Sequence, residues 1–139
     1  MTIALTSGEP SGIGPDIAII HAQKERTENL KVYADPDVLI ERAKLLNLPL
    51  VLKEGNTCKA GELSIFPVKS KERTLPGELN PNNAEYVLSL IEQATYDCLN
   101  NKCNGILTGP INKAVINEAG IKFSGHTEYL AELSNCSKT

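Results

Sequence analysis

Two kinds of hydrophobic pattern alternate along this chain. Short apolar runs, typical of buried strands, are separated by longer segments in which apolar residues recur every three or four positions, as on one face of a helix. Strands are expected at residues 2–7, 30–34, 48–53, 62–68 and 105–109, and helices at 15–24, 36–46, 80–99, 110–120 and 126–134. Because alternating strands and helices favour a mostly parallel sheet covered on both faces, the predicted fold class is a three-layer α/β/α arrangement.

Local signals sharpen two of these elements. Asp35 stands where a helix N-cap is expected, with Pro36 behind it, and the apolar positions of the segment that follows share one face. Pro67 falls in the strand expected at 62–68, and since proline cannot donate to a ladder, it predicts that this strand lies at an edge of the sheet. In sheets of this kind ligands bind beyond the carboxyl ends of the strands, so the loops leaving those ends are where a site is expected.

Length and composition restrict the class of protein. The chain has 139 residues, enough for a single core, and its net charge of −3 gives no basic footprint for nucleic acid. No apolar run reaches the roughly 18 to 20 residues of a membrane helix, and the N-terminus lacks the features of a signal peptide. The four cysteines show neither a C-x-x-C pair nor metal-ligand spacing, which indicates reduced, structural thiols. We therefore expect a cytoplasmic protein without nucleic-acid or membrane partners.

A glycine-rich stretch, TSGEPSGIGPD at residues 6–16, joins the first expected strand to the first helix. Gly8, Gly12 and Gly14 allow a bound group to approach the backbone closely, but they equally allow tight packing of the strand against the helix. They do not match G-x-G-x-x-G, because Ile17 stands where the third glycine belongs. On spacing alone, an anion site and a purely structural turn both stay open.

A second loop, TGPINK at residues 108–113, follows the last expected strand and opens a helix whose N-terminus favours an anion. Lys113 is either a ligand for that anion or, as is more common for such a lysine, a solvated charge. In the glycine-rich stretch at residues 6–16, Glu9 and Asp16 are candidate capping acids of the helix that follows.

The stretch FSGHTEYL places Gly125, His126 and Thr127 at the start of the last expected helix. One interpretation is local, because a histidine and a threonine at a helix N-terminus can be a cap residue and its neighbour. The other interpretation is functional: the imidazole and the hydroxyl point into one crevice and hydrogen-bond a polar substrate. His21, inside the first expected helix, is given no role.

Three separated motifs resemble one enzyme family. TSGEPSGIGPDIAI, LTGPINKAVINEAGI and FSGHTEYLAE, in this order, are similar to the N-terminal part of 4-hydroxythreonine-4-phosphate dehydrogenase, an enzyme of pyridoxal phosphate biosynthesis. The similarity runs over essentially all 139 residues, including ADPDVLIERAKLLNLPL. Family members continue well beyond this length, so residues 1–139 are expected to be the N-terminal segment of a two-domain dehydrogenase, roughly its first two-fifths.

The resemblance implies a fold like that of isocitrate and isopropylmalate dehydrogenases, with an active-site cleft between two α/β/α domains and a homodimer that completes each site. It also implies that His126 and Thr127 contact the substrate. The two loops lie near the cleft in the family, which assigns the cleft wall to Gly8, Glu9, Gly12, Gly14, Asp16, Gly109, Pro110 and Lys113. The glycine-rich turn is then interpreted as shaping this wall near a small phosphorylated substrate or a cofactor.

The reaction implied by the resemblance is NAD-dependent oxidation of 4-phosphooxy-L-threonine followed by decarboxylation, with a divalent metal such as zinc, magnesium or cobalt. The family's three metal-binding histidines lie beyond residue 139, so this chain alone is expected to hold no metal and to be inactive. Two further hypotheses stay open. One is a related dehydrogenase of a phosphorylated four-carbon sugar acid, and the other is a non-catalytic α/β module that binds an anion or pairs with a partner chain.

Overall fold

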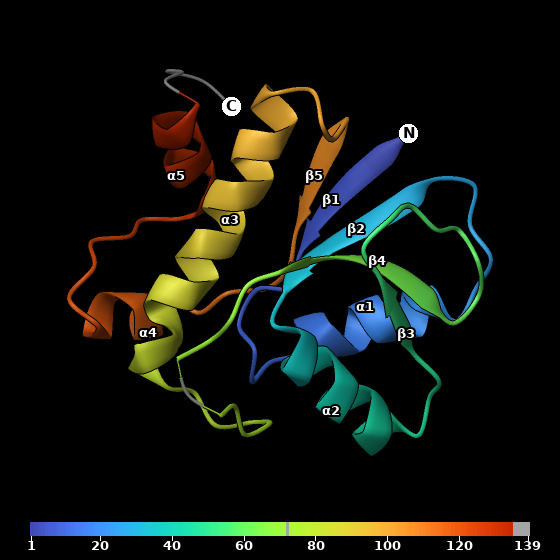
Figure 1. Cartoon of the computed structure of the whole chain (residues 1–139). Helices are drawn as coiled ribbons and strands as arrows, with labels where there is room; N and C mark the ends of the chain where they lie inside the picture. Colours follow the sequence, from blue (N-terminus) through green and yellow to red (C-terminus); the bar gives the residue numbers. More distant parts are fainter. Residues whose placement is uncertain (72, 135–139) are drawn as a thin grey trace.

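The computed structural model describes residues 1–71 and 73–134, and its elements follow the expected alternation of strands and helices (Figure 1). The strands are β1 (Thr2–Thr6), β2 (Asn29–Ala34), β3 (Val51–Lys53), β4 (Glu62–Pro67) and β5 (Gly105–Thr108). The helices are α1 (Gly14–Ala22), α2 (Pro36–Leu46), α3 (Ala84–Leu99), α4 (Lys113–Glu118) and α5 (His126–Leu133), and a 3-10 turn, η1 (Pro81–Asn83), precedes α3. Within these described ranges, no helix has both the length and the apolar character needed to cross a membrane.

The strands form one sheet in the order β3-β4-β2-β1-β5, and every pair in it is parallel. β1 lies between β2 and β5, with Ile3 opposite Leu30 on one side and opposite Gly105 on the other. Because all strands run the same way, their carboxyl ends gather at a single edge of the sheet. The predicted α/β class with a mostly parallel sheet is confirmed.

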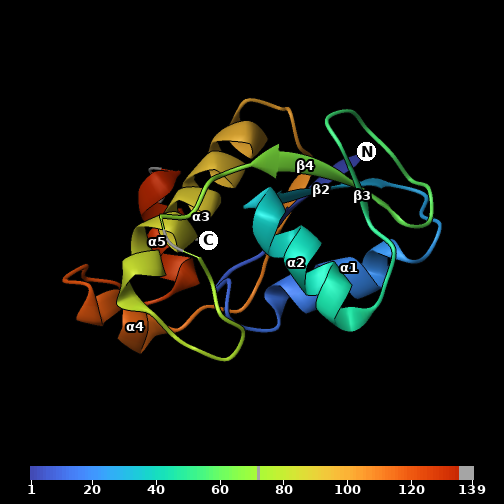
Figure 2. The ribbon, with the colours of Figure 1, turned by 60° about the horizontal axis from the view of Figure 1, so that its bottom comes forward.

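Helices cover both faces of this sheet (Figure 2). On one face α1 and α2 lie side by side, and Ala18, Ile19 and Leu39 are buried against side chains of β2 and β4. On the other face α3 packs against the sheet, and α4 and α5 lie beside α3. The three layers therefore bury two separate hydrophobic clusters, one on each side of the sheet.

The ends of α2 show why the sequence predicted this helix well. The Asp35 side chain accepts a hydrogen bond from the Asp37 N–H at 2.9 Å, which is the contact of an N-cap. At the other end Asn47 adopts a left-handed conformation with φ of 57°, a common way to stop a helix. Between them, Leu39 and Arg42 both face the interior, although arginine is rarely buried without partners.

The edge position predicted from Pro67 is wrong. β4 is an interior strand that lies between β3 and β2, while β3 and β5 are the edges of the described sheet. Pro67 is tolerated because it is the last residue of β4, and the short β3 pairs only with Glu62–Ser64 at the other end of the strand. The proline therefore marks the end of a strand at a position without a neighbour on that side.

The outer side of α1 carries apolar side chains that the described chain leaves uncovered. Ile13, Ile17 and Ile20 are 61%, 50% and 53% exposed, although the inner side of the same helix is buried. Leu107 on the edge strand β5 is 57% exposed and pairs with Leu5 of β1. Apolar side chains exposed in this way are typical of a surface that associates with other polypeptide.

Candidate functional site

The two predicted loops meet at the carboxyl edge of the sheet because β1 and β5 are neighbours. The N–H of Glu9 donates to the carbonyl oxygen of Pro110 at 2.9 Å, and the N–H of Gly109 donates to that of Thr6 at 2.7 Å. Residues 7–14 and 109–112 therefore form one continuous structure, which we call the loop wall.

Backbone packing explains two glycines of the first turn. Gly8 has φ of +73°, which other residues rarely adopt, and a Cβ there would overlap the carbonyl oxygen of Pro110. A Cβ at Gly14 would overlap the carbonyl oxygen of Ser7. At both positions a side chain would push neighbouring backbone apart, so glycine is required by the fold itself.

The other two glycines of the loop wall differ from each other. A Cβ at Gly109 would lie 2.6 Å from the carbonyl oxygen of Thr6, which is also too close. A Cβ at Gly12 would have the carbonyl oxygen of Glu9 as its nearest neighbour, at 3.4 Å, an ordinary contact. Backbone packing, between the two loops at Gly8 and Gly109 and within the first loop at Gly14, thus accounts for three of these four glycines without any ligand.

Neither Glu9 nor Asp16 caps α1. The N-cap residue of this helix is Ile13, which makes no side-chain cap hydrogen bond. Glu9 is buried, and its carboxylate accepts a hydrogen bond from the Ser11 hydroxyl at 2.9 Å, inside the turn. Asp16 lies in the first turn of α1, as predicted, where a negative charge is favourable, but its carboxylate pairs with Arg42 at 2.9 Å. Both acids therefore hold the turn in place.

Arg42 contacts the loop wall from α2, and none of the three sequence motifs includes it. Its side chain is 6% exposed, so its charge depends on partners inside the protein. One sequence signal could have found it: Arg42 stands three residues after Leu39 and four after Val38, on the apolar face of the predicted helix. A charge at such a position indicates a buried polar contact.

Lys113 links the second loop to the histidine segment. It is the first residue of α4, which Asn112 caps by accepting a hydrogen bond from the Val115 N–H. The Lys113 side chain is exposed, and its ammonium group donates to the carbonyl oxygen of Ser124 at 2.9 Å. This hydrogen bond ends two residues before His126, so the second and third motifs are adjacent in space.

His126 and Thr127 are the first two residues of α5. The His126 ring meets the Phe123 ring edge-on, with centroids 6.4 Å apart. Its Nε2 atom is buried and has no hydrogen-bond partner within the described residues. Burial lowers the pKa of His126, because a charged imidazole is poorly solvated there, so the ring is neutral at neutral pH. Thr127 is exposed.

The structure thus brings the predicted site residues together only in part. Hydrogen bonds join the glycine-rich turn to the second loop, and Lys113 joins the second loop to Ser124. Among the described residues, no hydrogen bond, ion pair or ring contact connects His126 or Thr127 directly to the glycine-rich turn. The loop wall lies at the carboxyl edge of the sheet, whereas α5 lies beside α3 (Figure 1).

Within residues 1–71 and 73–134, no group of three or more His, Cys, Asp or Glu side chains is placed to hold a metal ion. Cys58, Cys98 and Cys103 are free thiols, and Cys136 lies outside the described residues. The described side chains therefore do not fit the divalent metal that the resemblance implies.

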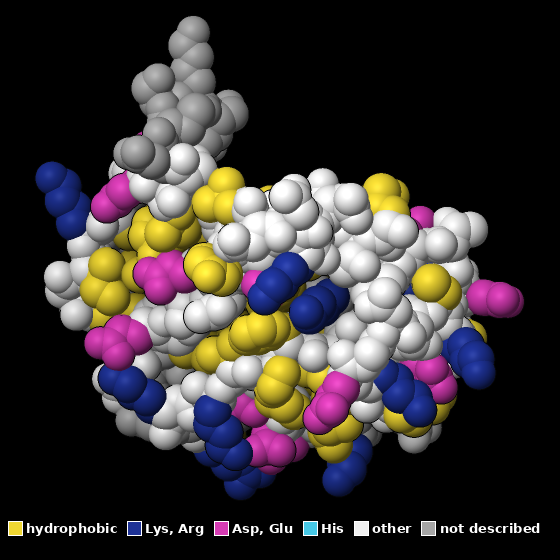
Figure 3. Space-filling model, turned by 45° about the horizontal axis from the view of Figure 1, so that its top comes forward, with side chains coloured by type: hydrophobic (Ala, Val, Ile, Leu, Met, Phe, Trp, Pro, Cys, Tyr) yellow, Lys and Arg dark blue, Asp and Glu magenta, His cyan; other side chains and the backbone are white. Residues whose placement is uncertain are grey.

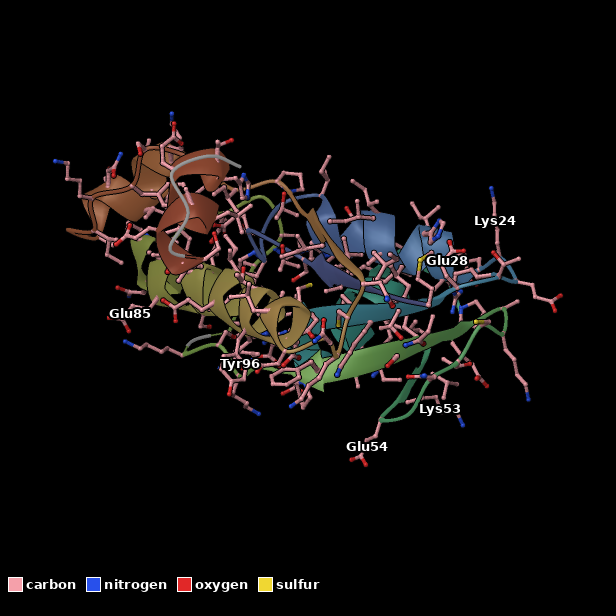
Figure 4. The ribbon with its side chains drawn as sticks, turned by 90° about the horizontal axis from the view of Figure 1, so that it is seen from above. Lys24, Glu28, Lys53, Glu54, Glu85 and Tyr96 are labelled. Carbon is pink, nitrogen blue, oxygen red and sulfur yellow. The ribbon has the colours of Figure 1, made fainter. Side chains whose placement is uncertain are left out.

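Charged side chains of both signs are mixed over the surface. Figure 3 shows Lys and Arg interspersed with Asp and Glu on one face, with hydrophobic side chains between them. In Figure 4 the labelled side chains of Lys24, Lys53 and Glu54 project outward, Lys53 from the last residue of β3 and the other two from loops. The face in Figure 3 shows no broad single-sign patch of the kind that attracts nucleic acid.

Known proteins are similar to this chain both in sequence and in fold. The model of the family described as pyridoxal phosphate biosynthetic protein PdxA matches residues 26–139. A 4-hydroxythreonine-4-phosphate dehydrogenase from Saccharophagus degradans is 46% identical over 138 residues, which cover 96% of this chain and 41% of that protein. One from Serratia proteamaculans is 42% identical over 142 residues, which cover 98% of this chain and 43% of that protein.

Solved structures agree with these matches. A 4-hydroxythreonine-4-phosphate dehydrogenase from Klebsiella pneumoniae superposes with a TM-score of 0.83 at 26% identity, over 96% of this chain and 44% of that one. A terephthalate 1,2-cis-dihydrodiol dehydrogenase from Burkholderia xenovorans shares the fold alone, with a TM-score of 0.79 at 24% identity. The chain spans less than half the length of the relatives it matches. On the family match and these identities, the chain belongs to the PdxA family of pyridoxal phosphate biosynthetic proteins.

Proposed function

We propose that this chain is the N-terminal part of an NAD-dependent dehydrogenase that oxidises 4-phosphooxy-L-threonine, with decarboxylation following, in pyridoxal phosphate biosynthesis. The observation that carries the proposal is the 46% identity, along 96% of the chain, with a protein named 4-hydroxythreonine-4-phosphate dehydrogenase. NAD supplies the hydride acceptor of such a reaction when it is bound. The chain's own residues bind and orient the substrate.

His126 and Thr127 are the proposed substrate contacts. The imidazole is neutral at neutral pH, so it offers one hydrogen-bond donor and one acceptor. Its buried Nε2 is unpaired within the described residues, and buried polar groups in native proteins rarely stay unpaired. The exposed Thr127 hydroxyl, next along α5, adds a donor and an acceptor for a polar substrate.

The loop wall is the proposed boundary of the substrate cleft. Its members and their neighbours are Gly8, Glu9, Gly12, Gly14, Asp16, Gly109, Pro110 and Lys113. Buried hydrogen bonds hold this structure in shape, so it limits where the phosphorylated end of a substrate lies. Its proposed role is to position the phosphorylated end of the substrate and to exclude other placements of it.

The described residues do not fit a divalent metal, and no step assigned to this chain uses one. We propose that the zinc, magnesium or cobalt ion, and the remaining substrate and NAD contacts, depend on polypeptide beyond these residues, within a homodimer. Light scattering on the complete polypeptide tests the homodimer, and a monomeric mass would contradict it.

The activity is tested with the complete polypeptide that carries these residues. We expect NADH to form from NAD and 4-phosphooxy-L-threonine in the presence of the metal, and more slowly from a phosphorylated four-carbon sugar acid. A preference for the sugar acid would assign the related activity instead, and no turnover of either would favour a non-catalytic module. Residues 1–139 alone should show no turnover with added zinc, magnesium or cobalt.

A further inference from the structure

Arg42 joins parts of the chain that are distant in sequence. From α2, its Nη1 donates to the carbonyl oxygen of Gly12 at 2.8 Å and to Oδ1 of Asp16 at 2.9 Å. Its Nη2 donates to the carbonyl oxygen of Pro10 at 2.8 Å. The residue is 5% exposed, so the guanidinium lies inside the protein, between α2 and the turn that joins β1 to α1.

The two carbonyl contacts orient the peptide groups of the turn. In a planar trans peptide, the carbonyl and the N–H of the following residue point in opposite directions. Because the carbonyls of Pro10 and Gly12 point to Arg42, the N–H groups of Ser11 and Ile13 point away from α2. Arg42 therefore sets the orientation of the turn without standing on its outer surface.

Arginine suits this place better than another cation. Its planar fork presents several donors at fixed angles, which matches two carbonyl oxygens and one carboxylate around it. Lysine carries one ammonium group and cannot span the same acceptors in this arrangement. The Asp16 carboxylate balances the buried charge, which would otherwise be costly to desolvate.

We propose that Arg42 is a positioning residue of the substrate cleft: by holding the carbonyls of Pro10 and Gly12, it keeps residues 8–14 in the shape that meets Pro110. The proposal rests on the proposed function, in which the loop wall faces the phosphorylated substrate. Arg42 is buried behind the turn and acts through it.

Hydrogen exchange in the chain of residues 1–139 tests this positioning directly. In Arg42→Lys we expect amide exchange in residues 8–14 to rise by about tenfold or more, while exchange in α3 stays unchanged. The matched control is Lys44→Met, an exposed position on the same helix, which should alter neither region.

Two outcomes of the exchange experiment would overturn the proposal. Unchanged exchange in residues 8–14 of Arg42→Lys would show that the turn holds its shape without the guanidinium. An equal rise in the turn and in α3, or a chain that does not fold, would show that Arg42 supports the whole domain and not the turn in particular.

Kinetics in the complete polypeptide test the link to the substrate. Arg42→Lys should raise KM for 4-phosphooxy-L-threonine by about tenfold with kcat changed less than about twofold, because a loosened wall weakens binding while the reacting groups are intact. A lowered kcat with unchanged KM would contradict this role. If the unaltered polypeptide does not oxidise this substrate, the proposed function fails, whereas the exchange result still decides whether Arg42 positions the turn.

Discussion

The loop wall and the start of α5 carry the residues that the sequence singled out for function, and they are built in opposite ways. In the loop wall the polar groups meet each other: Arg42 binds backbone carbonyls, and the Glu9 carboxylate binds Ser11. α5 has no buried residue, and the buried Nε2 of His126 has no partner within the described residues. Packing thus explains most of the glycines and charged residues of the loop wall. At the start of α5, by contrast, no contact of the fold explains the buried Nε2 of His126.

The largest effect that this comparison predicts is a loss of folding when a side chain enters the loop wall. In Gly14→Val the new Cβ would overlap the Ser7 carbonyl oxygen, and we expect a loss of about 4 kcal/mol or more in the free energy of unfolding. Urea denaturation of the chain measures it. Gly12→Ala is the control in the same turn, because its Cβ has room, and it should change stability by less than about 1 kcal/mol. Similar stabilities for the two variants would contradict the explanation of Gly14 by backbone packing.

The next effect concerns activity at the start of α5. In the complete polypeptide, His126→Ala should lower kcat/KM by an amount equivalent to about 1 to 3 kcal/mol, as expected when a hydrogen bond to a polar ligand is lost. Its stability should stay close to that of the unaltered protein, since α5 buries no residue. His21→Ala, at an exposed position of α1, is the control and should leave the kinetics unchanged. Unchanged kinetics in His126→Ala would remove this histidine from the proposed site.

A smaller effect, on association of the chain with itself, is expected from the exposed apolar side chains of α1 and β5. Residues 1–139 should elute larger than the 15.0 kDa monomer, because Ile17 and Leu107 are half exposed or more. The double variant Ile17→Ser, Leu107→Ser should shift elution toward the monomer in size-exclusion chromatography. A monomer in both forms would show that this surface does not drive association of the chain.

The smallest predicted effect is on the pH dependence of stability. Burial lowers the pKa of His126 in the folded chain, so the unfolded chain takes up a proton first as pH falls below about 6.5. The folded state should therefore lose stability through the pH interval between the unfolded and the folded pKa, and be unaffected by His126 above it. In His126→Asn, which cannot titrate there, this loss should be absent. Identical pH profiles for the two chains, measured by thermal unfolding, would contradict a partly buried, neutral imidazole.

How much of this could be predicted from the sequence depends on whether the signal is local. α2 was predicted because the signals for its two ends are local: Asp35 caps its start, and it ends at Asn47. Pro67 misled because its tolerance depends on how far β3 extends beside β4, which no local pattern contains. The pairing of Arg42 with Asp16 joins residues 26 positions apart, so spacing rules for helices could not reveal it.

The candidate site shows the same limit. The motifs indicated the loop wall and the His126 segment, but they could not separate a glycine required by a neighbouring carbonyl from one that leaves room for a ligand. That distinction for Gly8 depends on Pro110, which folding brings next to it from a loop far along the chain. The unpaired Nε2 of His126 depends likewise on how α5 packs beside α3.

The central claim is that the start of α5, and not the glycines of the loop wall, supplies direct contacts to the substrate. The most direct test is the rise in Tm that 4-phosphooxy-L-threonine causes in the complete polypeptide and in its Gly12→Ala and His126→Ala variants. We predict that the substrate stabilises the unaltered protein and Gly12→Ala equally, and His126→Ala distinctly less. A full rise in Tm for His126→Ala, together with a lost rise for Gly12→Ala, would contradict the claim.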